Sequence, residues 1–288
     1  MIANSIKRIP IIKVIAEESE ATSDTLAIEE PLEIRLEYGS QNERQVRNIS
    51  VTMRTPGNDT ELAAGFLFTE GIIKDLKEIV TINHCFIACA ENKENVIQVS
   101  LNENTVPHLQ NTDRNFYTTS SCGVCGKGSI NAIRTVSTFV QQEDSNTINA
   151  GTLYRLPDIL RQHQKVFEDT GGLHASALFS SSGELLLVRE DVGRHNALDK
   201  LIGAAIQKKL LPLNKNVLML SGRASFELVQ KAVMAGINII AAVGAPSSLA
   251  VQLAEEFNIT LIGFLRGQRF NIYTAAHRVL IPDYEITH

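Results

Sequence analysis

Apolar and polar positions alternate in four stretches of the first hundred residues. The stretches are residues 11–15, 32–38, 47–53 and 96–101. A period of two is typical of strands that bury one face and expose the other. We therefore predict that residues 1–115 form a smaller, β-rich part of the protein.

One helix is predicted within this part. Leu62, Phe66 and Leu67 recur at helical spacing after the segment 57–61, Gly-Asn-Asp-Thr-Glu. That segment offers a capping residue and acidic side chains for the first helical turn.

Beyond residue 115 helices and strands alternate, which predicts an α/β core over residues 116–288. The predicted strands are residues 173–179, 184–188, 217–220, 237–243 and 259–264. The predicted helices are residues 129–140, 157–168, 197–208, 225–234 and 248–257. The polar run 141–149 is the predicted linker. The first two strands are separated by a short turn, which predicts that they form a hairpin. The last three are separated by helices, and such crossovers build a parallel sheet. The predicted fold class is α/β, with a partly parallel sheet and flanking helices.

Parallel strands end at one edge of their sheet, and open sheets of this type bind ligands there. The residues that follow the last three strands are rich in glycine, serine and arginine, and the candidates are Gly222, Arg223, Ser247, Arg266 and Arg269. Helix N-termini and arginine side chains favour anions, so we predict a phosphate-bearing nucleotide ligand. The signatures of NTP hydrolysis and NAD chemistry are absent from the sequence. The alternative is that these are ordinary polar loops with surface arginines.

Two of the four cysteines lie in the segment 118–128, Thr-Thr-Ser-Ser-Cys-Gly-Val-Cys-Gly-Lys-Gly. Its Cys122 and Cys125 are the candidate reactive residues. The cationic Lys127 and the N-terminus of the helix predicted after it would both lower the pKa of a nearby thiol.

The Cys-x-x-Cys spacing fits three kinds of site. One is a redox dithiol. Another is a zinc site, in which Cys85 and Cys89 would complete a tetrahedral set of ligands. The third is a carrier that holds a sulfane sulfur as a persulfide. The spacing alone does not separate them.

A dense run of ionisable side chains, residues 189–196, leads into the helix predicted at 197–208. Such a run commonly forms the salt-bridged, capped start of a helix. The alternative is a functional role, in which Asp191, Arg194 and His195 line a cleft.

Charge and composition limit the partners. A net charge of −5 at pH 7 over 288 residues argues against nucleic acid, which calls for a basic surface. Residues 1–14 are interrupted by charges and a proline, so they do not form a secretory signal. No apolar run is long enough to span a membrane. We expect a cytoplasmic protein with reduced cysteines.

Several short motifs occur in an order and spacing more specific than any one of them. They are Cys-Gly-Val-Cys-Gly-Lys at 122–127, Gly-Gly-Leu-His-Ala at 171–175, Glu-Asp-Val-Gly-Arg-His-Asn at 190–196, Ser-Gly-Arg at 221–223 and Ala-Pro-Ser-Ser at 245–248. Together they resemble the formate dehydrogenase accessory sulfurtransferase family (FdhD family). With residues 57–73 and 263–273, the resemblance covers the chain from about residue 45 to 280.

The resemblance implies a sulfurtransferase that serves a molybdenum enzyme. Members of the family accept sulfur from a cysteine desulfurase as a persulfide. They pass it to the molybdenum cofactor, a bis(molybdopterin guanine dinucleotide), before that cofactor enters formate dehydrogenase. By matching position, Cys122 is the persulfide carrier and Cys125 its neighbour in the motif. The matching cofactor-binding segment comprises Phe264, Leu265, Arg266, Gly267, Gln268 and Arg269. GDP is then a surrogate ligand, and we expect a homodimer.

The core of this family resembles that of cytidine deaminases, which raises deamination as a rival activity. Zinc deaminases carry His-x-Glu followed by Pro-Cys-x-x-Cys. Here Ser176 takes the place of that glutamate after His174, and Cys-x-x-Cys precedes the histidine and lacks the proline. We expect the deaminase-like fold without its chemistry, and no bound metal. A zinc-stabilised guanine-nucleotide-binding module and a thiol-disulfide oxidoreductase stay open as alternative functions.

Overall fold

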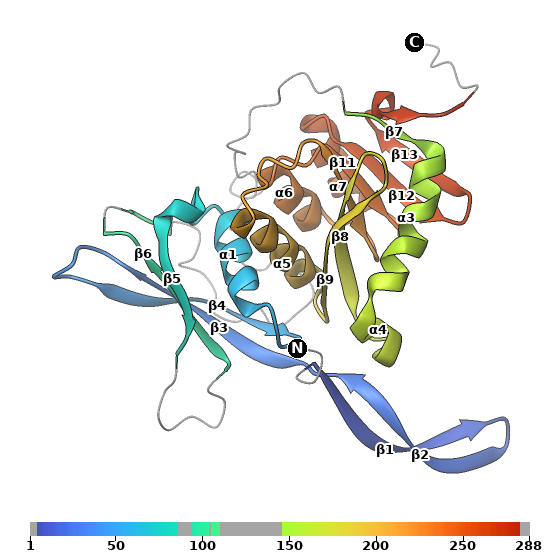
Figure 1. Ribbon diagram of the computed structural model, residues 1–288, viewed down its shortest axis with the longest axis horizontal. Coiled ribbons are helices and arrows are strands. Elements are labelled where there is room, and N and C mark those ends of the chain that lie inside the picture. Colours follow the sequence, from blue (N-terminus) through green and yellow to red (C-terminus); the bar gives the residue numbers. More distant parts are fainter. Residues whose placement is uncertain (1–4, 86–93, 104, 110–145, 283–288) are drawn as a thin grey trace.

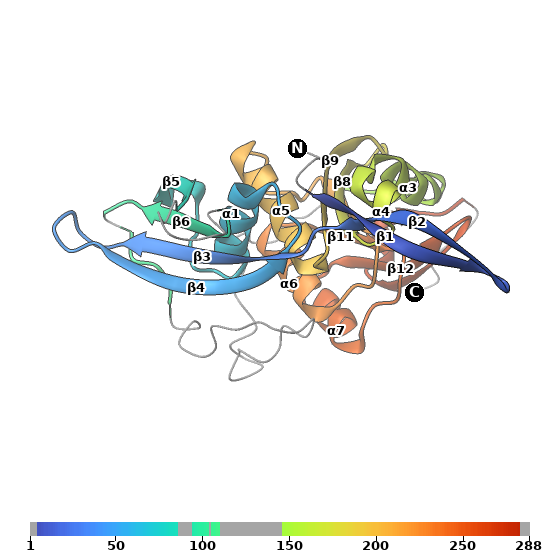
Figure 2. The same cartoon turned by 90° about the horizontal axis from the view of Figure 1, so that it is seen from below.

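The computed structural model describes residues 5–85, 94–103, 105–109 and 146–282. They form a mixed α/β fold with two lobes (Figure 1). The N-terminal lobe is built on a four-stranded sheet, and the larger lobe on a six-stranded sheet with helices on both faces. A two-stranded arm extends away from both lobes (Figures 1 and 2).

The sheet of the N-terminal lobe has the strand order β4-β3-β6-β5. The strands of this sheet are β3 (Glu30–Tyr38), β4 (Gln45–Arg54), β5 (Ile79–His84) and β6 (Val96–Leu101). The lobe also contains helix α1 (Asp59–Thr69) and the 3-10 turn η2 (Leu76–Glu78). Leu32, Ile34 and Leu36 are fully buried and alternate with half-buried residues along β3. This is the pattern of a sheet that packs one face against a helix. The helix predicted here and the strands predicted at 32–38, 47–53 and 96–101 are confirmed.

Strands β1 (Ile6–Ile15) and β2 (Glu18–Ala27) form the arm. All ten residues of β1 pair antiparallel with β2. The strand predicted at 11–15 is therefore only the outer half of β1. The sequence pattern did not reveal β2, because eight of its ten residues are exposed and it shows no apolar period.

The larger lobe has the strand order β13-β12-β11-β10-β8-β9. The strands are β8 (His174–Ser180), β9 (Leu185–Asp191), β10 (Asn216–Leu220), β11 (Ile239–Ala242), β12 (Thr260–Arg266) and β13 (Arg269–Thr274). Strands β10, β11 and β12 run parallel, whereas β8, β9 and β13 pair antiparallel with their neighbours. The predicted partly parallel sheet is confirmed, and β13 is an edge strand that was not predicted.

Helices cover both faces of this sheet (Figure 1). Helices α5 (Arg194–Gln207), α6 (Phe226–Met234) and α7 (Ser248–Glu256) lie on one face, and α3 (Ala150–His163) lies on the other. Along β10, Leu218 and Leu220 belong to the first core, and Val217 and Met219 to the second. A strand buried on both faces reads as an unbroken apolar run, which is how this strand was predicted.

The helix predicted at 157–168 is wrong in its bounds, because two helices span this region, α3 and α4 (Lys165–Thr170). Pro157 lies inside α3 rather than near its start. The start of α4 has a specific acceptor: the Glu190 carboxylate accepts hydrogen bonds from the backbone N–H groups of Val166 and Phe167, at 3.1 and 3.0 Å. Free N–H groups at a helix start need such a partner.

The predicted linker is also wrong in part. Ile148–Asn149 forms strand β7, which pairs parallel with β14 (Val279–Leu280), the strand that follows the 3-10 turn η3 (Ala276–Arg278). Residues 141–145, the helix predicted at 129–140 and the boundary predicted after residue 115 lie outside the described residues.

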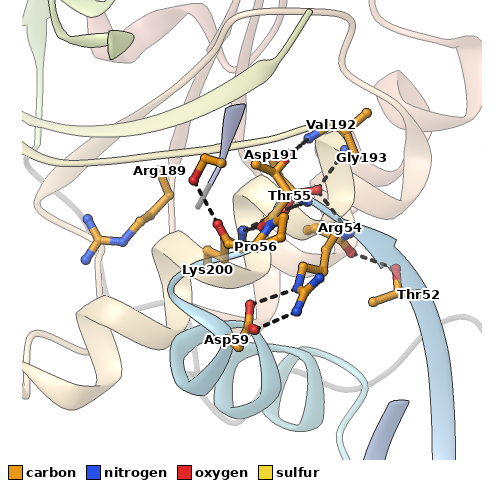
Figure 3. Close-up of polar contacts among 12 residues, drawn as sticks. Thr52, Arg54, Thr55, Pro56, Asp59, Arg189, Asp191, Val192, Gly193 and Lys200 are labelled. Carbon is orange, nitrogen blue, oxygen red and sulfur yellow. Dashed lines mark hydrogen bonds and ion pairs between the residues drawn. The ribbon is translucent and has the colours of Figure 1, made fainter. Parts of the chain in front are cut away.

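Buried polar side chains tie the end of β4 to α5 between the lobes (Figure 3). The Lys200 ammonium lies 2.6 Å from the Asp191 carboxylate and donates to the carbonyl oxygen of Thr55 at 2.8 Å. The Thr55 N–H donates to the same carboxylate at 3.2 Å. Beside them, Arg54 donates two hydrogen bonds to Asp59 at 3.1 and 3.0 Å.

Asp191 therefore has a structural role, and the interpretation that it lines a cleft is wrong. Its side chain is completely buried. Burial raises the pKa of Asp191, and the pair with Lys200 together with hydrogen bonds from the Gly193 N–H and the Asn196 side chain oppose this rise. The interpretation as a salt-bridged, capped helix start is confirmed for the ion pair, which Asp191 makes with Lys200 of α5. It is not confirmed for the cap, because the N-cap residue of α5 is Gly193, which has no side chain.

Candidate functional site

The segments at the carboxyl ends of β10, β11 and β12 lie side by side, and we call residues 221–225, 243–248 and 263–269 the carboxyl edge. The Gly244 N–H donates to the carbonyl oxygen of Gly222 at 2.9 Å, and the Phe264 N–H donates to the carbonyl oxygen of Gly244 at 3.1 Å. Backbone hydrogen bonds therefore link each loop to the next.

Two glycines let these loops approach closely. A Cβ atom on Gly244 would lie 3.0 Å from Cγ of Arg223, and one on Gly263 would lie 2.8 Å from Cδ of Pro246. A side chain at either position would displace a neighbouring loop. Both glycines are required here for backbone approach.

The hairpin of β12 and β13 carries the segment that the resemblance assigns to the cofactor. Leu265 is fully buried in the core, so only its backbone is available to a ligand. The guanidinium carbon of Arg266 lies 5.8 Å from the ring centroid of Phe264. The exposed residues at the tip of the hairpin are Arg266, Gly267, Gln268 and Arg269. Their role in cofactor binding stays a prediction.

Arg223 and Ser247 are both exposed at the same edge. The Ser247 hydroxyl accepts a hydrogen bond from the Ala250 N–H at 3.2 Å and so caps α7. Helices α6 and α7 both begin at this edge, and their N-termini add partial positive charge to that of the arginines. The structure thus brings together the arginines, the glycines and the serine that were predicted to attract an anion.

His174 joins this edge because β8 runs antiparallel to β10. The Ser221 hydroxyl accepts from the Ala175 N–H at 2.8 Å, and Nδ1 of His174 would lie 3.2 Å from a Cβ on Gly222. Burial lowers the pKa of His174, and the nearby charges of Arg194, His195 and Arg223 lower it further. Its surroundings at this edge therefore favour the neutral form of the His174 imidazole.

His195 at the start of α5 is held by two residues that sequence reasoning missed. Its Nε2 lies 3.8 Å from the Glu227 carboxylate and 3.5 Å from the Ser225 hydroxyl. The contact with His195 lowers the pKa of Glu227 to about 2, against the opposing effect of burial. The Ser-x-Glu sequence at the start of the predicted helix 225–234 was the available signal.

Cys122, Cys125 and Cys89 lie outside the described residues. Cys85 is half-buried after β5, with its Sγ 3.6 Å from Oε1 of Gln98. In the described part of the chain, no group of three or more His, Cys, Asp or Glu side chains is arranged to hold a metal ion. The persulfide, dithiol and zinc interpretations of the cysteines remain predictions.

Within residues 5–85, 94–103, 105–109 and 146–282, no helix is both long enough and apolar enough to span a bilayer.

Comparison with known proteins connects this geometry to a family. The model of the FdhD/NarQ family matches residues 27–280. The sulfur carrier protein FdhD of Mycolicibacterium paratuberculosis is 53% identical over 267 residues, which is 92% of this chain and 95% of that protein. The protein of the same name from Picrophilus torridus is 43% identical over 93% of this chain and 96% of its own length.

A solved structure agrees with the fold. The crystal structure described as a formate dehydrogenase accessory protein from Desulfotalea psychrophila has a TM-score of 0.73 and 25% sequence identity, and the match covers 96% of this chain and 99% of that one. The fold and these relatives define an accessory protein of the sulfur-carrier class. The chain belongs to the FdhD/NarQ family.

Proposed function

We propose that this protein accepts sulfur from a cysteine desulfurase as a persulfide on Cys122 and passes it to the molybdenum cofactor destined for formate dehydrogenase. The support is the similarity of nearly the whole chain to proteins named as sulfur carriers, and the Cys-x-x-Cys motif at residues 122–125. We further propose that this takes place in the cytoplasm, and that residues 1–115 and 116–288 are two domains.

The first transfer is a thiol exchange. The thiolate of Cys122 attacks the outer sulfur of the donor persulfide, a new S–S bond forms on Cys122, and the donor cysteine leaves as a thiolate. No electrons are lost or gained overall. Release of the carried sulfur as sulfide consumes two electrons, and the Cys125 thiol can supply them by forming a disulfide with Cys122.

The carboxyl edge is the proposed site for the cofactor, a bis(molybdopterin guanine dinucleotide). The observation that carries this assignment is the set of hydrogen-bonded loops that places the exposed Arg223, Ser247 and Arg266 at one edge, where α6 and α7 begin. Arginine guanidinium groups and the free backbone N–H groups at helix N-termini donate hydrogen bonds to phosphate oxygens. GDP, which carries the guanine and two phosphates, is the surrogate ligand.

We also assign the six-stranded core to the cytidine-deaminase type of fold, without its chemistry. Ser176 of β8 is buried and holds the position where a deaminase would carry a catalytic glutamate. A serine hydroxyl cannot replace a carboxylate as the proton carrier at neutral pH.

Mass spectrometry tests the carrier role. After incubation with cysteine and a desulfurase, the wild-type protein should gain the mass of one sulfur atom on Cys122, and a reducing agent should remove it. Cys122→Ser should gain none. An unmodified wild-type protein under these conditions would contradict the proposal.

A further inference from the structure

Basic side chains from three elements converge at the carboxyl edge. His174 begins β8, and its Nδ1 would lie 3.2 Å from a Cβ on Gly222, the residue before Arg223. Strand β9, the neighbour of β8, leads into α5, which starts with Arg194 and His195. The charges of Arg194, His195 and Arg223 all act on the His174 imidazole. We call His174, Arg194, His195 and Arg223 the basic cluster.

Positive charge exceeds negative charge around His174. Within the part of the chain that the structure describes, the charges that act most on this imidazole come from three basic groups and from one carboxylate, that of Asp191 on β9. Asp191 is buried and already pairs with Lys200 at 2.6 Å. Glu227, at the start of α6, lies 3.8 Å from Nε2 of His195. Both carboxylates next to the basic cluster therefore have a cationic partner of their own.

A negatively charged ligand would change the charge state of this cluster. Burial and the three basic neighbours lower the pKa of His174, and Asp191 opposes this. His174 is half-buried and Arg223 is exposed, so a ligand in solvent can reach both. An anion among these groups would offset the repulsion that lowers the pKa of the imidazole. A protonated His174 would then offer a second N–H donor to that anion.

We propose that the basic cluster holds a phosphate or diphosphate group of the ligand, and that His174 takes up a proton when this anion binds. The proposal rests on the proposed function of the carboxyl edge and adds the residue that couples binding to pH. Arg223 supplies a guanidinium that stays charged at every relevant pH. His195 is already in contact with the Glu227 carboxylate, so the proton is assigned to His174.

Proton uptake gives the affinity for the anion a defined dependence on pH. The bound anion raises the pKa of His174 above its value in the free protein, so the affinity rises as the pH falls between these two pKa values. Uptake of one proton changes the affinity by up to about tenfold per pH unit. Outside this window His174 has the same charge in the free and the bound protein, and its contribution to the pH dependence disappears.

Titration calorimetry of the full chain with GDP and with pyrophosphate tests this, from about pH 6.5 to 8.5. Heats measured in two buffers with different enthalpies of ionisation give the number of protons taken up. The wild type should take up more protons per bound anion than His174→Gln, and its affinity should fall more steeply as the pH rises. Protons exchanged by the anion itself are common to both proteins. His163→Gln, at the exposed end of α3, is the control and should match the wild type.

Nuclear magnetic resonance of the wild type with ¹⁵N-labelled histidine gives a second readout. Saturation with pyrophosphate should move the His174 nitrogen signals, assigned by their loss in His174→Gln, toward those of an imidazolium. Equal proton uptake by the wild type and His174→Gln, or unmoved His174 signals, would overturn the inference while GDP binding stands. Proton-linked binding of pyrophosphate without binding of GDP would support the basic cluster and contradict the nucleotide assignment in the proposed function. If neither anion bound, both would be overturned.

Discussion

Gly65 of α1 lies directly against Gly203 of α5, where the two lobes meet. A Cβ atom on Gly65 would lie 1.9 Å from the carbonyl oxygen of Asp199, and one on Gly203 would lie 1.9 Å from the carbonyl oxygen of Glu61. The two helix backbones are thus in contact, and the junction has no space for a methyl group at either position.

Gly65→Ala should destabilise the protein by about 3 kcal/mol or more, because overpacking alone typically costs roughly 1–3 kcal/mol and here the clash is with backbone. The gain in helix propensity, about 1 kcal/mol, is smaller. Urea unfolding measures the difference. Gly151→Ala is the control, since a Cβ on that glycine of α3 meets nothing within 4 Å. It should stabilise by about 0.5–1 kcal/mol. Equal stability of Gly65→Ala and wild type would contradict the close contact.

Lys200→Met should cost about 3–5 kcal/mol, because it leaves the Asp191 carboxylate buried without its cation. The second substitution, Asp191→Asn, removes that charge while keeping an acceptor for the Thr55 N–H. Lys200→Met/Asp191→Asn should therefore be more stable than Lys200→Met. If urea unfolding gave the double variant the lower stability, repulsion of an unpaired charge would not be the cause.

Glu227, in the first turn of α6 beside the carboxyl edge, makes the stability of the protein depend on pH. Its folded pKa of about 2 is below the ordinary value of 4.5, so its contacts contribute stability above about pH 4.5, and this contribution is lost as the pH falls to about 2. Glu227→Gln should show a weaker dependence of the unfolding free energy on pH within this window. Urea unfolding at several pH values measures the slope. Glu168→Gln, at an exposed site in α4, is the control and should keep the wild-type slope.

Cys122→Ser should fold normally but abolish the formation of active formate dehydrogenase in a cell that relies on this protein, because a serine hydroxyl cannot take the persulfide sulfur at the proposed carrier position. Cys125→Ser should cause partial loss, since the second thiol assists the first. Formate oxidation in cell extracts measures both effects. Full activity with Cys122→Ser would remove that residue from the carrier role.

Arg266→Ala should weaken GDP binding by about tenfold to a hundredfold, because a hydrogen bond to a charged group contributes about 1.5–3 kcal/mol. Titration calorimetry measures the affinity. Lys208→Ala, at the opposite end of α5 from the carboxyl edge, should bind as the wild type does. Equal affinities for Arg266→Ala and wild type would place the nucleotide elsewhere.

Burial decides which elements could be predicted from sequence. Strand β6 was predicted at its observed bounds because alternate residues pack against α1. Strand β2 carries no such pattern, since the arm has no core to pack against. The two helices at residues 150–170 were merged and misplaced, because Pro157 resembles a helix start and the acceptor that stabilises the start of α4, Glu190, is distant in sequence.

The carboxyl edge was predicted in part for a similar reason. The order of strands and helices is enough to bring Arg223 and Arg266 to one edge. His174 could not be placed there, because its position depends on the pairing of β8 with β10. Asp191 and His195 could not be distinguished within one charged run. Asp191 is buried because Thr55, at the end of β4, and Lys200 contact it, whereas His195 stays partly exposed. These contacts exist only in the folded protein.

The loops of the carboxyl edge are joined through main-chain atoms, and this divides their positions into two groups with different evolutionary freedom. Substitution of Arg223 or Gln268 changes what the edge presents to a ligand and leaves each joining bond in place. Gly244 and Gly263 do not share this freedom, since any side chain there pushes the loops apart. Relatives can therefore acquire a different ligand preference on an unchanged frame.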